Sequence, residues 1–372
     1  MGPNNPPNTR ATGSRSLAFM PQLHSLRAIC ILAVIYTHHL TEKYWLFGIY
    51  WGRLGVQCFF VLSGFLITSI LIRESETASS FRPIYVSFIS RRAFRLYPLL
   101  LVTLTVCAVL GINAVRDGFL WHVTYLTNLY VIKVDAWPGP VSPLWSLAVE
   151  EQFYLFWPFV IYFTPRRLLP ALLIVFIAAA PAFRLIWRAE GLGDFGAWVL
   201  PPAYFDSLAM GALLALYKKR TEVLWLAGLA GTCIWLILAL MPPDSQTFFA
   251  QAAPEDTAAA MIFAWVIARA STGFHGMAGN ILNNSALQYI GAISYGIYVL
   301  HGFVPYYLET HGLTDFLPHW LSKLTSVGLT IILASISWHV LERPVTRLGQ
   351  SALDRWKLRL RVEPGASPHG QV

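Results

Sequence analysis

Charged residues are scarce in this chain. Asp, Glu, Lys and Arg make up 12% of its 372 residues, whereas apolar residues make up 56%, and the mean hydropathy is +0.53. A soluble globular chain carries about 25% charged residues, so this composition excludes that class. There is also no stretch that could form a separate soluble domain. The sequence predicts an all-α integral membrane protein whose helices form one bundle.

Cysteine is equally sparse. Each of the four cysteines, Cys30, Cys58, Cys107 and Cys233, lies within an apolar run, with no CxxC or Cys/His spacing. The pattern therefore predicts neither disulfides nor a zinc site, and we expect no metal and no tightly bound cofactor.

Basic residues exceed acidic ones, 27 against 19, for a formal net charge of +8. They cluster in short connectors between apolar runs rather than on a soluble face, so they favour membrane lipids as partners and not nucleic acid. Residues 1–21 are rich in Pro, Asn, Ser and Thr, and we expect a disordered tail there. No small-residue cleavage site follows the first apolar run, so we do not expect a cleaved signal peptide.

Ten runs are long enough to cross a hydrocarbon core of about 30 Å. They cover residues 22–41, 54–72, 95–112, 145–163, 168–187, 200–217, 223–241, 258–274, 287–308 and 320–341. An eleventh run, Gly118 to Ile132, is short and carries His122, Thr124, Thr127 and Asn128. We expect a re-entrant or interfacial helix there.

The distribution of Lys and Arg sets the expected orientation. With ten crossings, the clusters of Lys and Arg fall on one side, whereas the opposite connectors contain few, and those at 242–257 and 309–319 contain none. The positive-inside rule then places both termini in the cytoplasm. We expect the chain to lie in the cell (inner or plasma) membrane. The basic segment 343–372 becomes a cytoplasmic tail, and 22–342 is the transmembrane domain.

Two adjacent acids, Glu150 and Glu151, interrupt the run from Trp145 to Phe163. A carboxylate at membrane depth costs roughly 2.5–3.5 kcal/mol, so it normally faces a bundle interior or a wet cavity. The alternative is that both glutamates reach the headgroups, beside an interfacial Trp145. We favour the first interpretation and treat both glutamates as candidate site residues.

The first span contains Arg27 near its cytoplasmic end and His38 and His39 near its outer end. Eleven positions complete about three helical turns, so Arg27 and His38 share one face about 16 Å apart, whereas His39 points elsewhere. A histidine in an apolar helix is more often a structural hydrogen-bond partner. At the depth of Glu150 and Glu151, however, the His38 imidazole could act as a general base on a hydroxyl, oriented by a carboxylate.

Further polar residues lie at helix ends. Arg92 and Arg95 are one turn apart before the third span, close to Arg91 and to Arg73. They either mark the cytoplasmic side or bind a donor that carries phosphates, since guanidinium groups bind phosphate bidentately.

Three polar residues in later spans are weaker candidates. Asp206 needs a partner such as Arg184 or a residue near His38, for either structural pairing or catalytic support. Tyr298 and His301 share a helical face and could line an acceptor cleft, although an interfacial aromatic belt also explains the tyrosine.

Seven segments, read in order, resemble the membrane-bound acyltransferase-3 family, whose members O-acylate carbohydrates and some antibiotics. The segments are LHSLRAICILAVIYTHH, GVQCFFVLSGFLITSIL, RRAFRLYP, WSLAVEEQFYLFWP, FDSLAMGALLA, ISYGIYVLHGFVP and LERPVTRL, within residues 20–348. One difference is His24 with Ser25, where the family commonly has Asp and Gly. Some members carry a fused extracytoplasmic esterase-like domain, and we expect a stand-alone version here.

The resemblance implies roles for single residues. Arg27 and His38 correspond to the family's arginine and essential histidine, and Arg92 and Arg95 to its motif for the acyl donor. Its Ser-x-x-x-Glu-Glu segment corresponds to Ser146, Glu150 and Glu151. The implied co-substrate is acyl-CoA, most simply acetyl-CoA, and the implied acceptor is a carbohydrate or glycolipid.

Two other classes of function remain open from the sequence. In a transporter or flippase, the buried His, Arg and Glu would relay protons or substrate, but no inverted repeat and no paired Gly/Pro-broken spans are detectable. A non-catalytic membrane scaffold would leave the buried charges unexplained.

Overall fold

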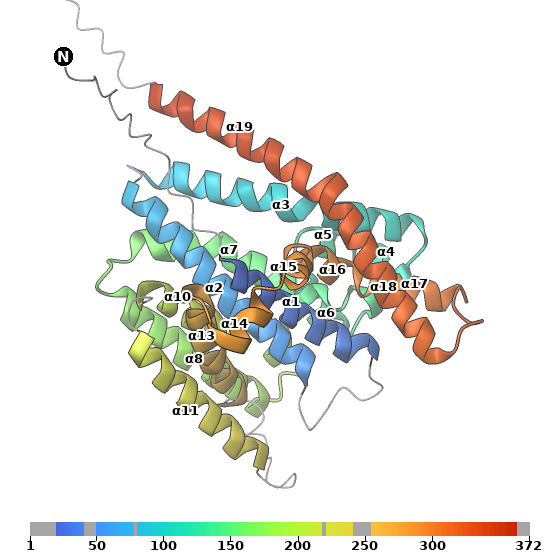
Figure 1. Cartoon of the computed structure of the whole chain (residues 1–372), viewed down its shortest axis with the longest axis horizontal. Helices are drawn as coiled ribbons and strands as arrows, with labels where there is room; N and C mark the ends of the chain where they lie inside the picture. Colours follow the sequence, from blue (N-terminus) through green and yellow to red (C-terminus); the bar gives the residue numbers. More distant parts are fainter. Residues whose placement is uncertain (1–19, 41–49, 78–79, 218–220, 241–253, 363–372) are drawn as a thin grey trace, which may run out of the picture.

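The structure is a computed structural model, which describes residues 20–40, 50–77, 80–217, 221–240 and 254–362. The described residues form helices and no strands. The predicted disordered tail, residues 1–21, lies almost entirely outside this range. Figure 1 shows the helices gathered around α1 and α2, with α3 and α19 along one end. The all-helical membrane class predicted from the composition is confirmed.

The first three long helices carry the basic and histidine motifs. Helix α1 spans Pro21–Ile35 and continues as a π-helix, η1, over Tyr36–Leu40. Helix α2 spans Trp51–Thr77, and α3 spans Phe81–Val109 with Pro98 inside it. Because α3 starts well before the predicted span at 95–112, its arginines lie within a helix and not in a loop.

The segment around Gly118 to Ile132 consists of short helices. These are α4 (Asn113–Asp117), α5 (Phe119–Val123) and α6 (Thr127–Val134). Five to eight residues rise about 7–12 Å, far less than the hydrocarbon core, so none of them crosses it. His122 holds the turn, because its ring nitrogens contact the Thr127 hydroxyl at 3.0 Å and the Ala114 carbonyl at 3.2 Å.

The middle of the chain contains α7 (Leu144–Phe163), α8 (Leu169–Ala189), α9 (Gly196–Val199) and α10 (Phe205–Tyr217). The short 3-10 helices η2 (Gly139–Val141) and η3 (Pro201–Tyr204) precede α7 and α10. Helices α11 (Thr221–Leu240) and α13 (Pro254–Thr272) pack against each other, and α14 (Gly276–Leu282) follows.

The predicted span at 287–308 is not one helix. It is divided into α15 (Ser285–Ala292), α16 (Ser294–Leu300) and α17 (Phe303–Thr310). The break after α16 brings Gly302 against the Pro140 carbonyl, where a Cβ would lie only 2.3 Å from the oxygen. Ser294 stands at the first break and His301 with Gly302 at the second, but isolated polar residues do not divide a run that is otherwise apolar enough to be counted as one span.

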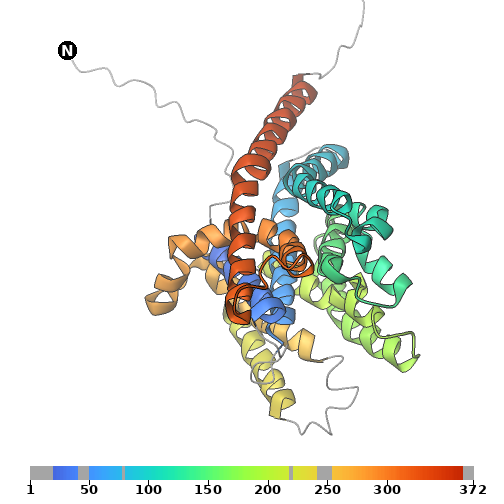
Figure 2. The same ribbon diagram turned by 90° about the vertical axis from the view of Figure 1, so that its right-hand side faces the viewer.

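The chain ends in a long helical stretch. It comprises α18 (His319–Ser337), the π-helix η5 (Trp338–Glu342) and α19 (Arg343–Val362). The predicted basic tail therefore begins as a helix, and α19 packs along α3 (Figure 1), while Figure 2 shows it extending beyond the rest of the bundle.

Five helical segments in the described part of the chain are long and apolar enough to cross a membrane. They are Pro21–Leu40, Trp51–Glu76, Phe81–Val109, Leu169–Ala189 and His319–Lys357. A sixth is the pair Glu255–Thr272 and Gly276–Leu282, if its 83° bend is counted within one span. The predicted count of ten is therefore not confirmed, because several of the apolar runs form short or broken helices.

The bundle is held by close contacts between α2 and α10. A Cβ on Gly64 would lie 2.0 Å from the Leu208 carbonyl oxygen, and one on Gly211 would lie 2.0 Å from that of Val61. Small residues at such crossings let backbones approach and gain dispersion contacts, which drive helix association in lipid. Helices α1 and α2 approach in the same way at Gly55, where a Cβ would lie 2.6 Å from the Cys30 carbonyl oxygen.

Candidate functional site

A polar cavity lies among α1, α2, α3, α7 and α16. About 100 Å³ of it is open to water-sized molecules. Its polar lining consists of Arg27, Ser63, Arg92, Arg95, Ser146, Glu150, Tyr154, Ser294, Tyr295 and Tyr298. Five segments far apart in the sequence thus converge on one cavity that contains three guanidinium groups and one carboxylate.

The three arginines are held by different partners. Arg27 donates from Nε and Nη2 to the Ser294 hydroxyl, at 3.2 and 3.1 Å. The Arg92 guanidinium lies 4.0 Å from the centre of the Tyr154 ring, a cation–π contact. Arg95 lies within electrostatic range of both other arginines. Three like charges in a low-dielectric cavity repel one another, and an anion placed between them would relieve this repulsion.

Glu150 occupies the opposite wall of this cavity. The Ser63 hydroxyl donates to its Oε1 and also lies 3.0 Å from the Tyr154 hydroxyl. Glu150 is close enough to Arg27 to attract it electrostatically. This places one of the two predicted glutamates in a bundle interior, as expected. Glu151 does not line the cavity, and Arg92 is the cation within its electrostatic range.

His38 lies outside the cavity, on the π-helix that ends the first span. Its ring is 5.5 Å from that of His301 and 6.3 Å from that of His39, measured between centroids. The side chain is exposed, and neither Glu150 nor Glu151 is among the groups that act on it. The expected contact between His38 and Glu150 or Glu151 is therefore absent from the structure.

Glu150 lies beside Arg27, about three helical turns from His38, which explains the missing contact. The direction of His39 also differs from the expectation, because the first span ends in a π-helix. The wider turn of the π-helix departs from the 100° step assumed for a regular α-helix, so helical counting fails beyond α1. As a result, His39 does not point away from His38 and His301, and its ring centroid lies 5.8 Å from that of His301. Nothing in the apolar sequence of the first span marks the start of a π-helix.

Tyr298 connects the cavity to the histidine cluster, which we define as His38, His39 and His301. Its hydroxyl lies 2.5 Å from the Ser146 hydroxyl and also donates to the Pro143 carbonyl at 3.1 Å. Its ring is 5.2 Å from that of His301. Tyr298 and His301 thus lie side by side, as predicted, and Tyr298 forms a polar link between the cavity and the histidine cluster.

The remaining basic candidates lie elsewhere. Arg91 donates to Ser87 and forms an ion pair with Glu74 on α2, and neither Arg91 nor Arg73 lines the cavity. Trp145 packs against Tyr204 and Phe60, with ring centroids 5.4 and 6.3 Å away, so it belongs to the bundle interior and is not only an interfacial ring.

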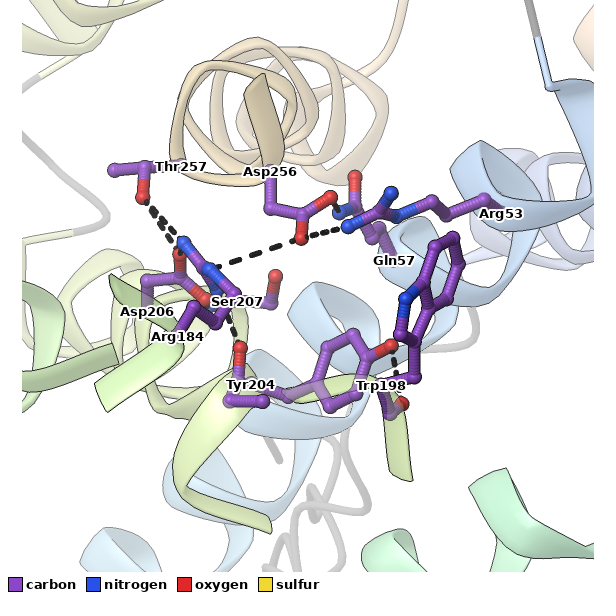
Figure 3. A network of polar contacts seen from close by, with 10 residues as sticks. Arg53, Gln57, Arg184, Trp198, Tyr204, Asp206, Ser207, Asp256 and Thr257 are labelled. Atoms are coloured by element: carbon purple, nitrogen blue, oxygen red, sulfur yellow. Dashed lines mark hydrogen bonds and ion pairs between the residues drawn. The ribbon is translucent and has the colours of Figure 1, made fainter. Parts of the chain in front are cut away.

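Asp206 belongs to a second, separate set of polar contacts (Figure 3). It accepts from Arg184 at 2.8 Å and from the Thr257 hydroxyl at 2.7 Å, which confirms the predicted pairing with Arg184. Asp256 lies 3.8 Å from Arg184 and also binds Arg53 and Gln57. The two arginines and two aspartates join α2, α8, α10 and α13, and their buried charges balance.

The sequence analysis missed Arg53, Gln57 and Asp256. All three stand near the ends of predicted spans, where polar residues are normal, so no spacing marked them. Among the described residues, no group of three or more His, Cys, Asp or Glu is arranged to hold a metal ion.

Comparison with known proteins identifies the family of this chain. A family model described as an acyltransferase domain matches residues 20–339. A protein named putative peptidoglycan O-acetyltransferase YrhL, from Bacillus subtilis, is 28% identical over 91% of this chain and 56% of its own length. The O-acetyltransferase OatA of Staphylococcus aureus is 28% identical over 90% of this chain and 58% of its own.

The peptidoglycan O-acetyltransferase OatA of Listeria monocytogenes is 27% identical over 91% of this chain and 58% of its own. The chain thus spans somewhat more than half the length of these relatives. No solved structure matches. Because the family model covers most of the described bundle, including both the cavity and the histidine cluster, the chain belongs to the acyltransferase family resembled by its motifs.

Proposed function

We propose that this protein is a membrane O-acetyltransferase that moves an acetyl group from cytoplasmic acetyl-CoA to a hydroxyl of an extracytoplasmic carbohydrate. The observation that carries the proposal is the cavity lined by Arg27, Arg92 and Arg95 beside Glu150. Three guanidinium groups within electrostatic range of one another favour a polyanionic ligand, and the phosphates of a coenzyme A thioester provide one.

We infer the donor's position from the order of Arg92, Arg95 and Arg27 between the cytoplasmic side and Tyr298. Arg92 and Arg95 hold the phosphates near the predicted cytoplasmic side, and Arg27 lies deeper, where it stabilises charge on the thioester arm. Arg73 and Arg91 do not line the cavity, so in this proposal they attract the anion toward it without binding it in place. The thioester then extends toward Ser146 and Tyr298.

The chemistry takes place at the histidine cluster. A ring nitrogen of His38 takes the proton from the acceptor hydroxyl, and the oxygen forms a bond to the thioester carbonyl carbon. The carbon–sulfur bond then breaks, and the coenzyme A thiolate leaves and takes up a proton. Glu150 does not orient His38 in this scheme. It holds Ser63 and offsets part of the charge of the three arginines.

The acceptor class rests on the relatives. Three relatives are named O-acetyltransferases, two of them of peptidoglycan. We therefore propose a glycan or lipid-linked sugar that presents its hydroxyl at the exposed His38. In the cell this requires the predicted orientation, with both termini cytoplasmic.

Donor binding tests the proposal. Purified protein in lipid nanodiscs should bind radiolabelled acetyl-CoA, and Arg92→Ala and Arg95→Ala should each weaken binding by about tenfold or more, since a charge-assisted bond contributes about 1.5–3 kcal/mol. The matched control is Arg166→Ala, because Arg166 bonds Ser75 and the Ile72 carbonyl outside the cavity. Equal binding by the wild type and both cavity variants would refute the donor site.

A further inference from the structure

His301 is a buried histidine with one ring nitrogen fixed. The side chain is 1% exposed, and its Nδ1 lies 2.6 Å from the Tyr298 carbonyl oxygen. Because a carbonyl only accepts hydrogen bonds, the ring proton is on Nδ1. Nε2 therefore carries a lone pair and can accept a hydrogen bond.

The Nε2 atom has no hydrogen-bond partner among the described residues, although it is fully enclosed. A buried acceptor without a partner is unfavourable, so such an atom points to a partner that approaches it. The His38 and His39 rings are 5.5 and 5.8 Å away. Two imidazoles joined by a hydrogen bond have centroids about 5 Å apart, so a small rotation suffices.

Of these two rings, His38 is the available donor. His39 already donates one ring N–H to the backbone of His301, so in the neutral ring its Nε2, which has no partner among the described residues, carries a lone pair and cannot donate. His38 is exposed on its other side, so it can contact His301 through one ring nitrogen while the second faces an incoming hydroxyl.

We propose that His301 is the positioning residue for His38, a role that rests on the proposed function. The His38 N–H donates to Nε2 of His301, which selects one tautomer and leaves the other His38 nitrogen free to take the acceptor's proton. His301 itself gains and loses no proton. It performs the orienting task that a carboxylate performs in other acid–base pairs, and Tyr298 holds it through its backbone carbonyl.

Two isosteric variants separate this role from a merely structural one. His301→Asn keeps a donor at the δ position for the Tyr298 carbonyl but has no atom at the ε position. His301→Gln places an amide oxygen at the ε position instead. We expect His301→Asn to lower kcat at least about tenfold with an unchanged KM for acetyl-CoA, and His301→Gln to retain most of the turnover.

The double variant His38→Ala/His301→Asn supplies an independent test. If His301 acts only through His38, the second substitution leaves the residual rate of His38→Ala unchanged. His122→Asn is the matched control, because His122 is equally buried and both its ring nitrogens are bonded. It should lower the Tm without changing kcat per folded molecule.

The outcomes distinguish this inference from the function beneath it. Full transfer by His38→Ala would overturn the proposed function itself. If His38→Ala is inactive, wild-type kcat in His301→Asn, equal losses in the Asn and Gln variants, or a further loss in the double variant would each overturn the positioning role alone.

Discussion

The Ser146 hydroxyl lies 2.5 Å from the Tyr298 hydroxyl and so joins α7 to α16 between the arginine cavity and the histidine cluster. Both side chains are buried. Ser146 stands one helical turn before Glu150, so this bond fixes the depth of the carboxylate relative to His301, which follows Tyr298 on the next turn.

Removal of the Tyr298 hydroxyl should therefore weaken catalysis. Tyr298→Phe keeps the ring and the backbone carbonyl that holds His301, but it leaves the Ser146 hydroxyl and the Pro143 carbonyl without this partner. The loss of about 1.4 kcal/mol corresponds to a tenfold lower kcat. Steady-state transfer by purified protein measures it, and Tyr306→Phe on α17 is the control, because the Tyr306 side chain is exposed. Unchanged kcat in Tyr298→Phe would contradict the proposed path.

The Asp206 ion pair should matter for stability. Asp206→Asn keeps the shape but removes the carboxylate at 2.8 Å from the buried Arg184, while Asp256 lies 3.8 Å away. Breaking a buried pair costs about 3–5 kcal/mol, because one charge stays uncompensated. Thermal unfolding in a fixed detergent should show a clearly lower Tm for Asp206→Asn. The Tm of Asp194→Asn should hardly change, since Asp194 is exposed. Equal Tm values would mean that the pair does not hold the bundle.

The contact between α2 and α10 gives a third prediction. In Gly64→Ala the new Cβ would meet the Leu208 carbonyl oxygen at 2.0 Å. A backbone atom cannot move aside cheaply, so overpacking should lower stability by about 1–3 kcal/mol. Gly328→Ala is the control, because a Cβ there meets nothing within 4 Å. If Gly64→Ala and Gly328→Ala both unfolded at the same temperature as the wild type, the close contact at Gly64 would not limit the stability of the bundle.

The fold class was predictable because membrane insertion demands long apolar helices, a constraint that shows directly in composition and hydropathy. The partnership of Asp206 with Arg184 followed from the cost of a lone buried charge. Broken helices were not predictable in this way. The run at 287–308 has only isolated polar residues at its breaks, Ser294 and His301, and the close approach of Gly302 to Pro140 depends on tertiary packing.

The candidate site was predictable in part for the same reason. Arg27, Arg92 and Arg95 were all expected near the cytoplasmic side, and they line one cavity, but Glu150 was expected at the depth of His38 and instead lines the cavity beside them. The contact of His38 with His301 was not foreseen, because a π-helix changes the direction of every side chain that follows it. Likewise, Arg53 and Asp256 stand where charges are common, and only the three-dimensional structure shows that they meet.

The most direct test of the central claim is acetyl transfer by His38→Ala. Membrane vesicles that contain equal amounts of folded wild type, His38→Ala or His339→Ala would be given radiolabelled acetyl-CoA and a glycan acceptor, and ester-linked label would be counted. His339 is exposed, and its ring nitrogen contacts the Ser335 carbonyl one turn earlier, away from the histidine cluster. The account predicts that His38→Ala loses at least about 100-fold of the transfer rate, whereas His339→Ala matches the wild type. Wild-type transfer by His38→Ala would contradict it.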